Sequence, residues 1–94
     1  MEKEKLIDKA HKLVRGCSRR EVAQQLKPAL SYLIYHRDLE KFKKLLETEA
    51  ASSRSKRHWE EAREKLIPLS ESYSVEELLY LIGVAIRLIG YYHR

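Results

Sequence analysis

One cysteine and four histidines are the side chains in this sequence that most often bind metal ions or act as nucleophiles. They are Cys17, His11, His36, His58 and His93. Zinc sites are built from closely spaced cysteines and histidines, and the chain shows no such pattern. The histidines are scattered among charged neighbours, so we interpret them as solvated surface residues. Because a lone cysteine cannot form an internal disulfide, we interpret Cys17 as a small residue in a turn, in a protein from a reducing compartment.

Motifs of enzymes that transfer phosphate or acyl groups are also missing. The sequence contains neither a glycine-rich phosphate-binding loop nor the short turn motif of a nucleophilic serine. Most acidic residues stand near Lys or Arg at helical spacing, as Glu61 does before Lys65, which indicates exposed ion pairs. We therefore expect a protein without catalytic residues, metal ions or cofactors.

Arg87 and His93 have a spacing that resembles a catalytic pattern. An Arg followed a few residues later by a His is similar to the motif of helical ribonucleases of the HEPN type. That resemblance would imply RNA cleavage by Arg and His side chains from two protomers. We prefer the alternative in which Arg87 is a polar position on the last helix and His93 belongs to a chain end, where helices fray.

Basic residues form three clusters along the sequence. The first is Lys12, Arg15, Arg19 and Arg20, the second is Arg54, Lys56 and Arg57, and the third is Lys41, Lys43 and Lys44. No acid lies between Asp8 and Glu21 to compensate the first cluster, whereas acids dilute the third. Phosphate binding needs several cations on one face, so we predict that all of these residues except Lys43 bind nucleic acid. The first and third clusters would converge if their helices were neighbours. Ordinary solvated faces are the alternative.

The net charge of +5 also favours an anionic partner, although the excess is modest. Four tyrosines could stack on bases or could instead form the half-buried rim of a core; they are Tyr32, Tyr35, Tyr91 and Tyr92. No set of side chains for reading base edges is evident. We therefore expect weakly sequence-dependent binding of single-stranded RNA or of a duplex that contains RNA.

The elements that must position these residues are helical. Apolar residues recur at the spacing of a helix face, first at Leu6, Ile7, Ala10, Leu13 and Val14. Gly16 should cap the C-terminus of this first helix, and Ser18 with Glu21 forms a capping box that predicts the start of a second. The second helix turns one face inward, at Val22, Ala23, Leu26, Leu30, Leu33 and Ile34. Pro28 predicts a kink in it, or the first turn of a new helix.

Asp38 can cap a third segment, which could equally be continuous with the second helix. Its inward residues should be Leu39, Phe42, Leu45, Leu46 and Ala50. Residues 51–58 are a basic, Ser-rich linker or a frayed helix end. Helical spacing resumes at Trp59, Ala62, Leu66 and Ile67, and Pro68 should end that helix before a loop over residues 69–73. We therefore predict one domain over residues 1–94, an all-α compact bundle of about five helices.

The last helix is predicted to be the hydrophobic hub of the bundle. Ser74 and Glu77 form a capping box, and the apolar residues that follow cover every side of the helix. We expect Leu79, Ile82, Ile86 and Ile89 to be fully buried. Gly83 and Gly90 lie on one face and predict a close crossing with another helix, within the chain or across a dimer. Gly83, Ile86 and Gly90 are therefore the predicted interface.

A family resemblance lies in the middle and at the end of the chain. Residues 26–32, Arg37 and residues 39–47 are similar to the middle of the small helical subunit of type III-A CRISPR effector complexes. Residues 90–94 look like that family's aromatic, histidine-containing terminus. The resemblance covers about half the chain. It implies a non-catalytic all-α protein of antiviral defence, whose copies stack along the crRNA–target duplex and contact RNA through basic residues.

Three functions are consistent with these observations. The first is a non-catalytic small subunit of a nucleoprotein complex that binds RNA or a nucleic-acid backbone together with other protein subunits. The second is a protein–protein adaptor or homodimeric module without nucleic-acid binding, and the third is a small ribonuclease that uses Arg87 and His93. The first residues do not resemble a signal peptide, and the longest apolar run is too short for a membrane span. We therefore expect a soluble cytoplasmic protein.

Overall fold

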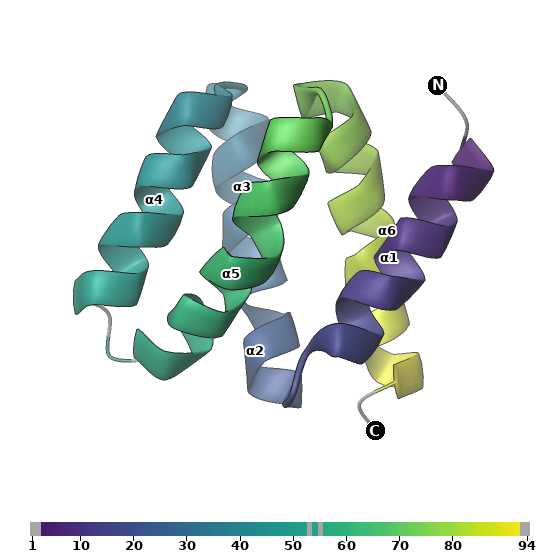
Figure 1. Cartoon of the computed structure of the whole chain (residues 1–94), viewed down its shortest axis with the longest axis horizontal. Helices are drawn as coiled ribbons and strands as arrows, with labels where there is room; N and C mark the ends of the chain where they lie inside the picture. The colour runs from purple at the N-terminus through teal and green to yellow at the C-terminus, as the bar shows by residue number, and fades with distance from the viewer. Residues whose placement is uncertain (1–2, 53, 55, 93–94) are drawn as a thin grey trace.

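The computed structural model describes residues 3–52, 54 and 56–92, and these residues form helices without any strand (Figure 1). The helices are α1 (Lys3–Gly16), α2 (Arg20–Gln24), α3 (Leu26–His36), α4 (Leu39–Ser52), α5 (Lys56–Ser72) and α6 (Val75–Tyr92). Only Gln25 separates α2 from α3, and its backbone keeps helical angles. If α2 and α3 are counted as one bent helix, the described chain has five. The predicted all-α bundle is confirmed.

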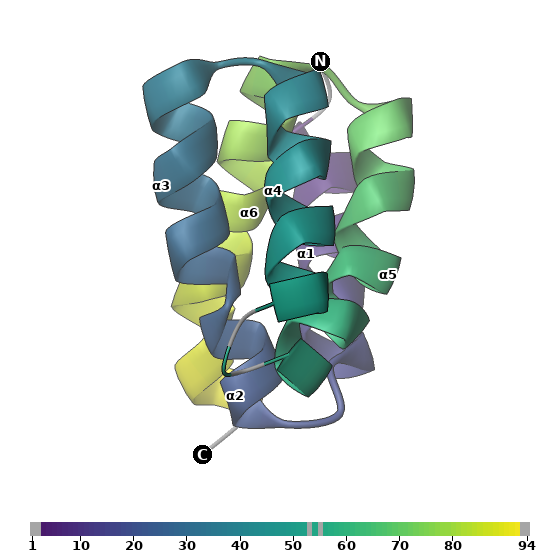
Figure 2. The same ribbon diagram turned by 90° about the vertical axis from the view of Figure 1, so that its left-hand side faces the viewer.

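Two pairs of neighbouring helices make up most of the bundle. α4 packs along α5, and α1 packs along α6. α3 lies behind α5 in Figure 1 and contacts both α4 and α6, so it joins the two pairs (Figures 1 and 2). The short α2 closes one end of the bundle, where it contacts α5 and α6.

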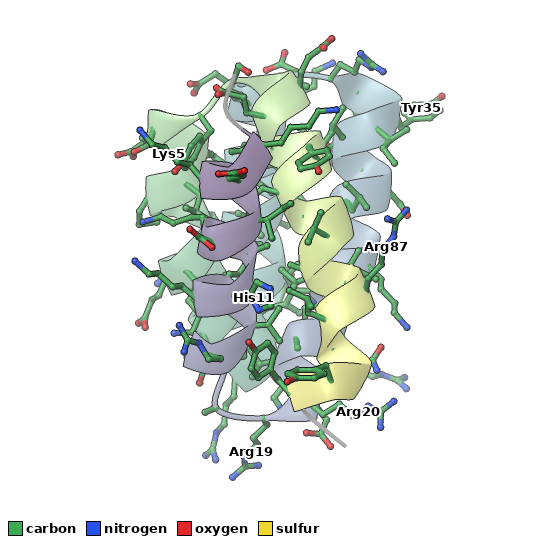
Figure 3. All side chains as sticks on the ribbon, turned by 90° about the vertical axis from the view of Figure 1, so that its right-hand side faces the viewer. Lys5, His11, Arg19, Arg20, Tyr35 and Arg87 are labelled. Carbon is green, nitrogen blue, oxygen red and sulfur yellow. The ribbon has the colours of Figure 1, made fainter. Side chains whose placement is uncertain are left out.

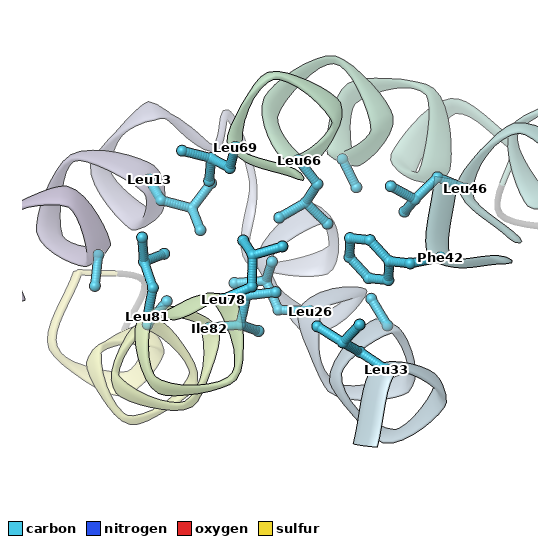
Figure 4. Packing of buried hydrophobic residues seen from close by; sticks show 14 of the residues in the cluster. Leu13, Leu26, Leu33, Phe42, Leu46, Leu66, Leu69, Leu78, Leu81 and Ile82 are labelled. Carbon is cyan, nitrogen blue, oxygen red and sulfur yellow. The ribbon is translucent and has the colours of Figure 1, made fainter. Parts of the chain in front are cut away.

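The core forms where the apolar stripes of the helices meet. Its largest fully buried side chains are Phe42, Leu6, Leu26, Leu33, Leu46, Leu66, Leu78, Leu81, Ile82 and Val14. Figure 4 shows Phe42 pointing from α4 into the bundle, toward Leu33 of α3 and Leu66 of α5. Burial of this apolar surface provides the main driving force for a small helical fold.

Several predicted helix boundaries are confirmed. The hydroxyl of Ser74 accepts a hydrogen bond from the Glu77 amide at 3.2 Å, and the Glu77 carboxylate accepts one from the Ser74 amide at 3.1 Å. Asp38 caps α4 by accepting hydrogen bonds from two backbone amides, at 2.9 and 3.3 Å. Arg37 has a left-handed backbone with φ of 49°, so α4 is separate from α3. Pro28 lies in the first turn of α3, and the helix bends three residues earlier at Gln25, so both predicted alternatives, a kink and a new first turn, describe this region.

Two predicted caps around the first turn are wrong in their chemistry. α1 does end at Gly16, but no glycine among the described residues has a positive φ, so the left-handed cap is not used. α2 begins at Arg20, and its N-cap residue Arg19 makes no side-chain capping hydrogen bond. Ser18 bonds instead to Glu61 of α5. A charged acceptor from a distant helix therefore replaces the local capping box.

The predicted end of the helix that contains Trp59 is also wrong. α5 continues through Pro68 to Ser72, and Leu69 and Ser70 are buried rather than part of a loop. Pro68 removes one helical hydrogen bond, to the carbonyl of Glu64. Glu64 is exposed, so water can satisfy that carbonyl. Most of the linker expected over residues 51–58 is helical, because α4 ends at Ser52 and α5 begins at Lys56. Residues 53 and 55 of that linker lie outside the described residues.

Apolar residues are less uniformly buried than the sequence predicted. α6 contacts α1, α2, α3 and α5, as expected of a hub, and its buried residues are Leu78, Leu81, Ile82, Ala85 and Ile89. Leu79 and Ile86 are only half-buried, so their predicted full burial is wrong. On α3, Ile34 is 53% exposed. For Leu79 and Ile86 the reason is geometric, because α6 lies at the surface of the bundle and one of its sides has no neighbour (Figure 3).

Candidate functional site

One residue of the first basic cluster and one of the second line the same cavity at one end of the bundle. At the lower end of Figure 1, the start of α5 lies beside α2. There Arg19, Arg57 and His58 line a cavity of about 220 Å³, together with Ser18, Val22 and Glu61. A neighbouring hollow at the start of α5 is lined by Arg54, Lys56, Arg57 and His58. We call the five residues Arg19, Arg54, Lys56, Arg57 and His58 the basic end.

A second cationic hollow lies between α1 and α5. It has a volume of about 260 Å³ and is lined by Lys9, Lys12, Leu13, Lys65, Pro68 and Leu69. Leu13 and Leu69 are buried and form an aliphatic floor with Pro68, while the lysines form the rim. We call these six residues the three-lysine groove.

Ser18 and Glu61 tie the loop after α1 to α5. The Ser18 amide donates to one carboxylate oxygen of Glu61 at 2.7 Å, and the Ser18 hydroxyl donates to the other at 2.6 Å. These hydrogen bonds lower the pKa of Glu61, with smaller contributions from the positive charges of Lys65 and His58. A carboxyl group with a lowered pKa stabilises the folded state above its ordinary pKa, and this contribution is lost as the pH falls through the lowered value.

Lys65 lies beside the C-terminal end of α1. A Cβ placed on Gly16 would be only 3.3 Å from the Lys65 Nζ, so glycine leaves room for the ammonium group there. A cation is favourable at a helix C-terminus. The neighbouring Cys17 is buried, and its thiol donates to the Leu13 carbonyl at 3.3 Å. Burial raises the pKa of the Cys17 thiol, with Lys65 acting in the opposite direction.

Other predicted cations lie apart from these two hollows. Arg15 and Arg20 are exposed and line neither of them; Figure 3 shows Arg20 near Arg19 at the α2 end of the bundle. Lys41 and Lys44 lie on α4 among Glu40, Lys43 and Glu47. α5 stands between α4 and α1 in Figure 1, so the condition for convergence of the first and third clusters is not met. The third cluster is a separate patch of mixed charge.

Sequence reasoning missed Lys9, His58 and Lys65. Lys9 lies three residues before Lys12, so helical spacing would have placed it near a predicted cation. Lys65 lies eight residues after Arg57, about 12 Å further along the helix. What the sequence could not provide was the position of α5 beside the end of α1. That packing makes one groove from lysines of two helices.

Aromatic and histidine side chains form contacts of their own. The Tyr92 hydroxyl lies 2.6 Å from the Nδ1 atom of His11, so His11 is a half-buried partner of α6 rather than a fully solvated residue. Tyr35 and Tyr91 are 84% and 66% exposed. Arg87 is exposed on α6 (Figure 3), and its predicted partner His93 lies outside the described residues. Within the described ranges, no three His, Cys, Asp or Glu side chains lie close enough to hold a metal ion.

None of the helices formed by residues 3–52 and 56–92 combines the length and apolarity of a membrane span. The chain matches no protein family model, no curated protein and no solved structure.

Proposed function

We propose that this protein is a non-catalytic helical subunit that binds the sugar–phosphate backbone of a nucleic acid through its basic end. The observation that supports this most directly is the cavity shared by Arg19 and Arg57. The two guanidinium groups come from separate parts of the sequence, and folding brings them to one surface. Convergent cations are the requirement for phosphate binding, because affinity depends on how many phosphates one face contacts.

The start of α5 strengthens this proposal. Its first turn contains no acidic residue and begins with Lys56, Arg57 and His58. Cations are unfavourable at a helix N-terminus, where the backbone carries partial positive charge. A bound phosphate would interact favourably with both the side chains and the backbone amides, and it would offset that cost.

The proposed ligand is RNA, in a complex with other protein subunits. The resemblance to the small subunit of type III-A CRISPR effector complexes makes RNA the first nucleic acid to test. Arg and Lys contacts to phosphates carry no sequence information directly, so binding should depend only weakly on sequence.

Charge reversal at the basic end tests this proposal. The double variant Arg19→Glu/Arg57→Glu should bind a fluorescent single-stranded RNA about tenfold more weakly at low salt. Its log–log salt dependence should be flatter by about 1.4, from two lost contacts at about 0.7 each. Fluorescence anisotropy at several salt concentrations measures both quantities.

The matched control is Lys41→Glu/Lys44→Glu on α4, which changes the net charge equally. It should retain more affinity than the basic-end variant. Equal losses in the two variants would show that only net charge matters, and an absence of RNA binding by the wild-type protein at low salt would overturn the proposal.

A second candidate function, self-association through α6, is favoured by the open surface around Gly83. A Cβ placed on Gly83 or Gly90 would meet no atom within 4 Å, so no close helix crossing occurs at these glycines within the described chain. Leu79, Tyr80 and Val84 are half-buried beside Gly83, and Arg87 borders the same shallow hollow. The third predicted interface residue, Ile86, packs partly against the core. A second copy could therefore supply the predicted crossing.

Substitution of Gly83 distinguishes an open helix face from an interface. If α6 pairs with a second copy, the wild-type protein has the mass of a dimer in solution and Gly83→Leu has that of a monomer. Sedimentation equilibrium provides the measurement. If the face is open, Gly83→Ala should raise the free energy of unfolding by roughly 1 kcal/mol, because alanine favours the helix and meets no neighbour. A wild-type protein that is monomeric in solution, together with this gain in unfolding free energy for Gly83→Ala, would contradict self-association through α6.

A further inference from the structure

We infer that the nucleic acid is single-stranded and runs from the basic end along α5 into the three-lysine groove, where an unpaired base or sugar covers the aliphatic floor. This inference rests on the proposed function and specifies its ligand and path. It assigns a role to Lys9, Lys12 and Lys65.

One side of α5 connects the two hollows. Arg57 borders the cavity at the basic end, Glu61 lies four residues later, and Lys65 borders the groove after four more. From Arg57 to Pro68 the helix rises about 16 Å, at about 1.5 Å per residue. A stacked strand advances about 3.4 Å per nucleotide, so this path accommodates about five nucleotides.

The charges along this path favour a polyanion. In the part of the chain that the structure describes, none of the three groove lysines forms an ion pair within 4 Å. Lys9 and Lys12, one turn apart on α1, repel each other, and a phosphate beside them would relieve that repulsion. Lys65 is already partly compensated by the negative charge of Glu61. Glu61 is the one carboxylate that lines either hollow, and both of its oxygens already accept hydrogen bonds from Ser18.

The floor of the groove favours an unpaired strand. Leu13 and Leu69 are 7% and 8% exposed, so most of the aliphatic surface that a ligand could cover belongs to the exposed Pro68. In a duplex the bases stack inside the helix, and the backbone that faces the protein is polar. An unpaired base or sugar can leave water and lie on the floor while its phosphate contacts a lysine. The floor contains no aromatic ring, so its contribution comes from apolar burial rather than stacking.

A length series of oligonucleotides tests the path. The probes are single-stranded oligouridylates of about three, six and ten nucleotides and an RNA duplex of about ten base pairs. For the wild-type protein, affinity at low salt should rise about tenfold between the three- and six-nucleotide probes, as the strand reaches the groove. The single strand should also bind more tightly than the duplex.

Lys9→Glu/Lys12→Glu should remove the gain with length and leave binding of the three-nucleotide probe unchanged. Both lysines are exposed, so the variant should fold, and circular dichroism checks this. Lys41→Glu/Lys44→Glu again matches the change in charge and should keep the gain. If Lys65→Gln alone reduces the gain in affinity with probe length, the strand also contacts the groove on its α5 side.

The outcomes separate this inference from the proposed function. If the shortest probe binds and loses affinity in Arg19→Glu/Arg57→Glu, but added length brings no gain, the path along α5 is wrong and the basic end stands. If the duplex binds as tightly as the single strand, the assignment to an unpaired strand is wrong. If no probe binds at low salt, the proposed function itself fails.

Discussion

Truncation of Phe42 to alanine should lower the free energy of unfolding by about 3–5 kcal/mol. Phe42 is fully buried and points from α4 into the bundle toward α3 and α5 (Figure 4). Its removal loses the favourable free energy of transferring a large apolar side chain out of water. It also leaves a cavity that the three surrounding helices cannot easily close. Domains of this size are marginally stable, so such a loss is a large part of the total. Urea denaturation followed by circular dichroism measures it.

Tyr35→Ala is the matched control, because it removes a side chain of similar size from an exposed position. Tyr35 is 84% exposed on α3, so its truncation should change the free energy of unfolding by about 0.5 kcal/mol or less. A loss at Phe42 no larger than the loss at Tyr35 would show that α4 does not pack on the core in the described way.

Features set by neighbouring residues could be predicted from the sequence. The cap of α6 involves Ser74 and Glu77, which are three residues apart, and the cap of α4 involves the side chain of Asp38 and the next few amides. Pro28 acts on the turn in which it lies. These interactions depend on short-range geometry that the sequence contains in full, so the helices and the all-α class followed from it.

Features set by distant residues could not be predicted in the same way. Ser18 had a local partner at Glu21, but the packing of α2 on α5 placed Glu61 closer. Pro68 carried a local signal to end α5, and burial of Leu69 and Ser70 overrode it. In both cases a tertiary contact outweighed the local conformational preference.

The candidate site shows the same division. The sequence identified Arg19 and Arg57 as members of uncompensated clusters, but not that they border one cavity. It also predicted that Lys41 would converge with Lys12 if their helices were neighbours, but α5 separates α4 from α1. Composition along the chain identifies cations, and only the arrangement of helices shows which of them lie together on one surface.

The exposed side of α6 could not be identified from the composition of the helix. Nearly every position of the helix is apolar, so the sequence could not distinguish the side that faces the core from the side that faces outward. The neighbouring helices decide this: Ile82 is fully buried, whereas Leu79 is half-buried on the open side beside Gly83. The two residues differ in burial far more than in chemistry.

Ile82→Ala should therefore lower the free energy of unfolding by about 2–5 kcal/mol, and Leu79→Ala by at most about half as much. The first substitution opens a cavity among the helices that surround Ile82, and the second removes a side chain that is already partly in contact with water. Thermal and urea denaturation of both variants give the comparison, at a protein concentration low enough to keep the chain monomeric.

Repeating the comparison at high protein concentration links it to function. For a monomer, the losses of unfolding free energy in Ile82→Ala and Leu79→Ala do not change with protein concentration, because no second copy covers Leu79. If the loss at Leu79 instead grows toward that at Ile82 as concentration rises, the outer side of α6 is buried by another copy, since association stabilises the folded state by mass action. That result would favour self-association through α6. Constant losses would argue against self-association through α6.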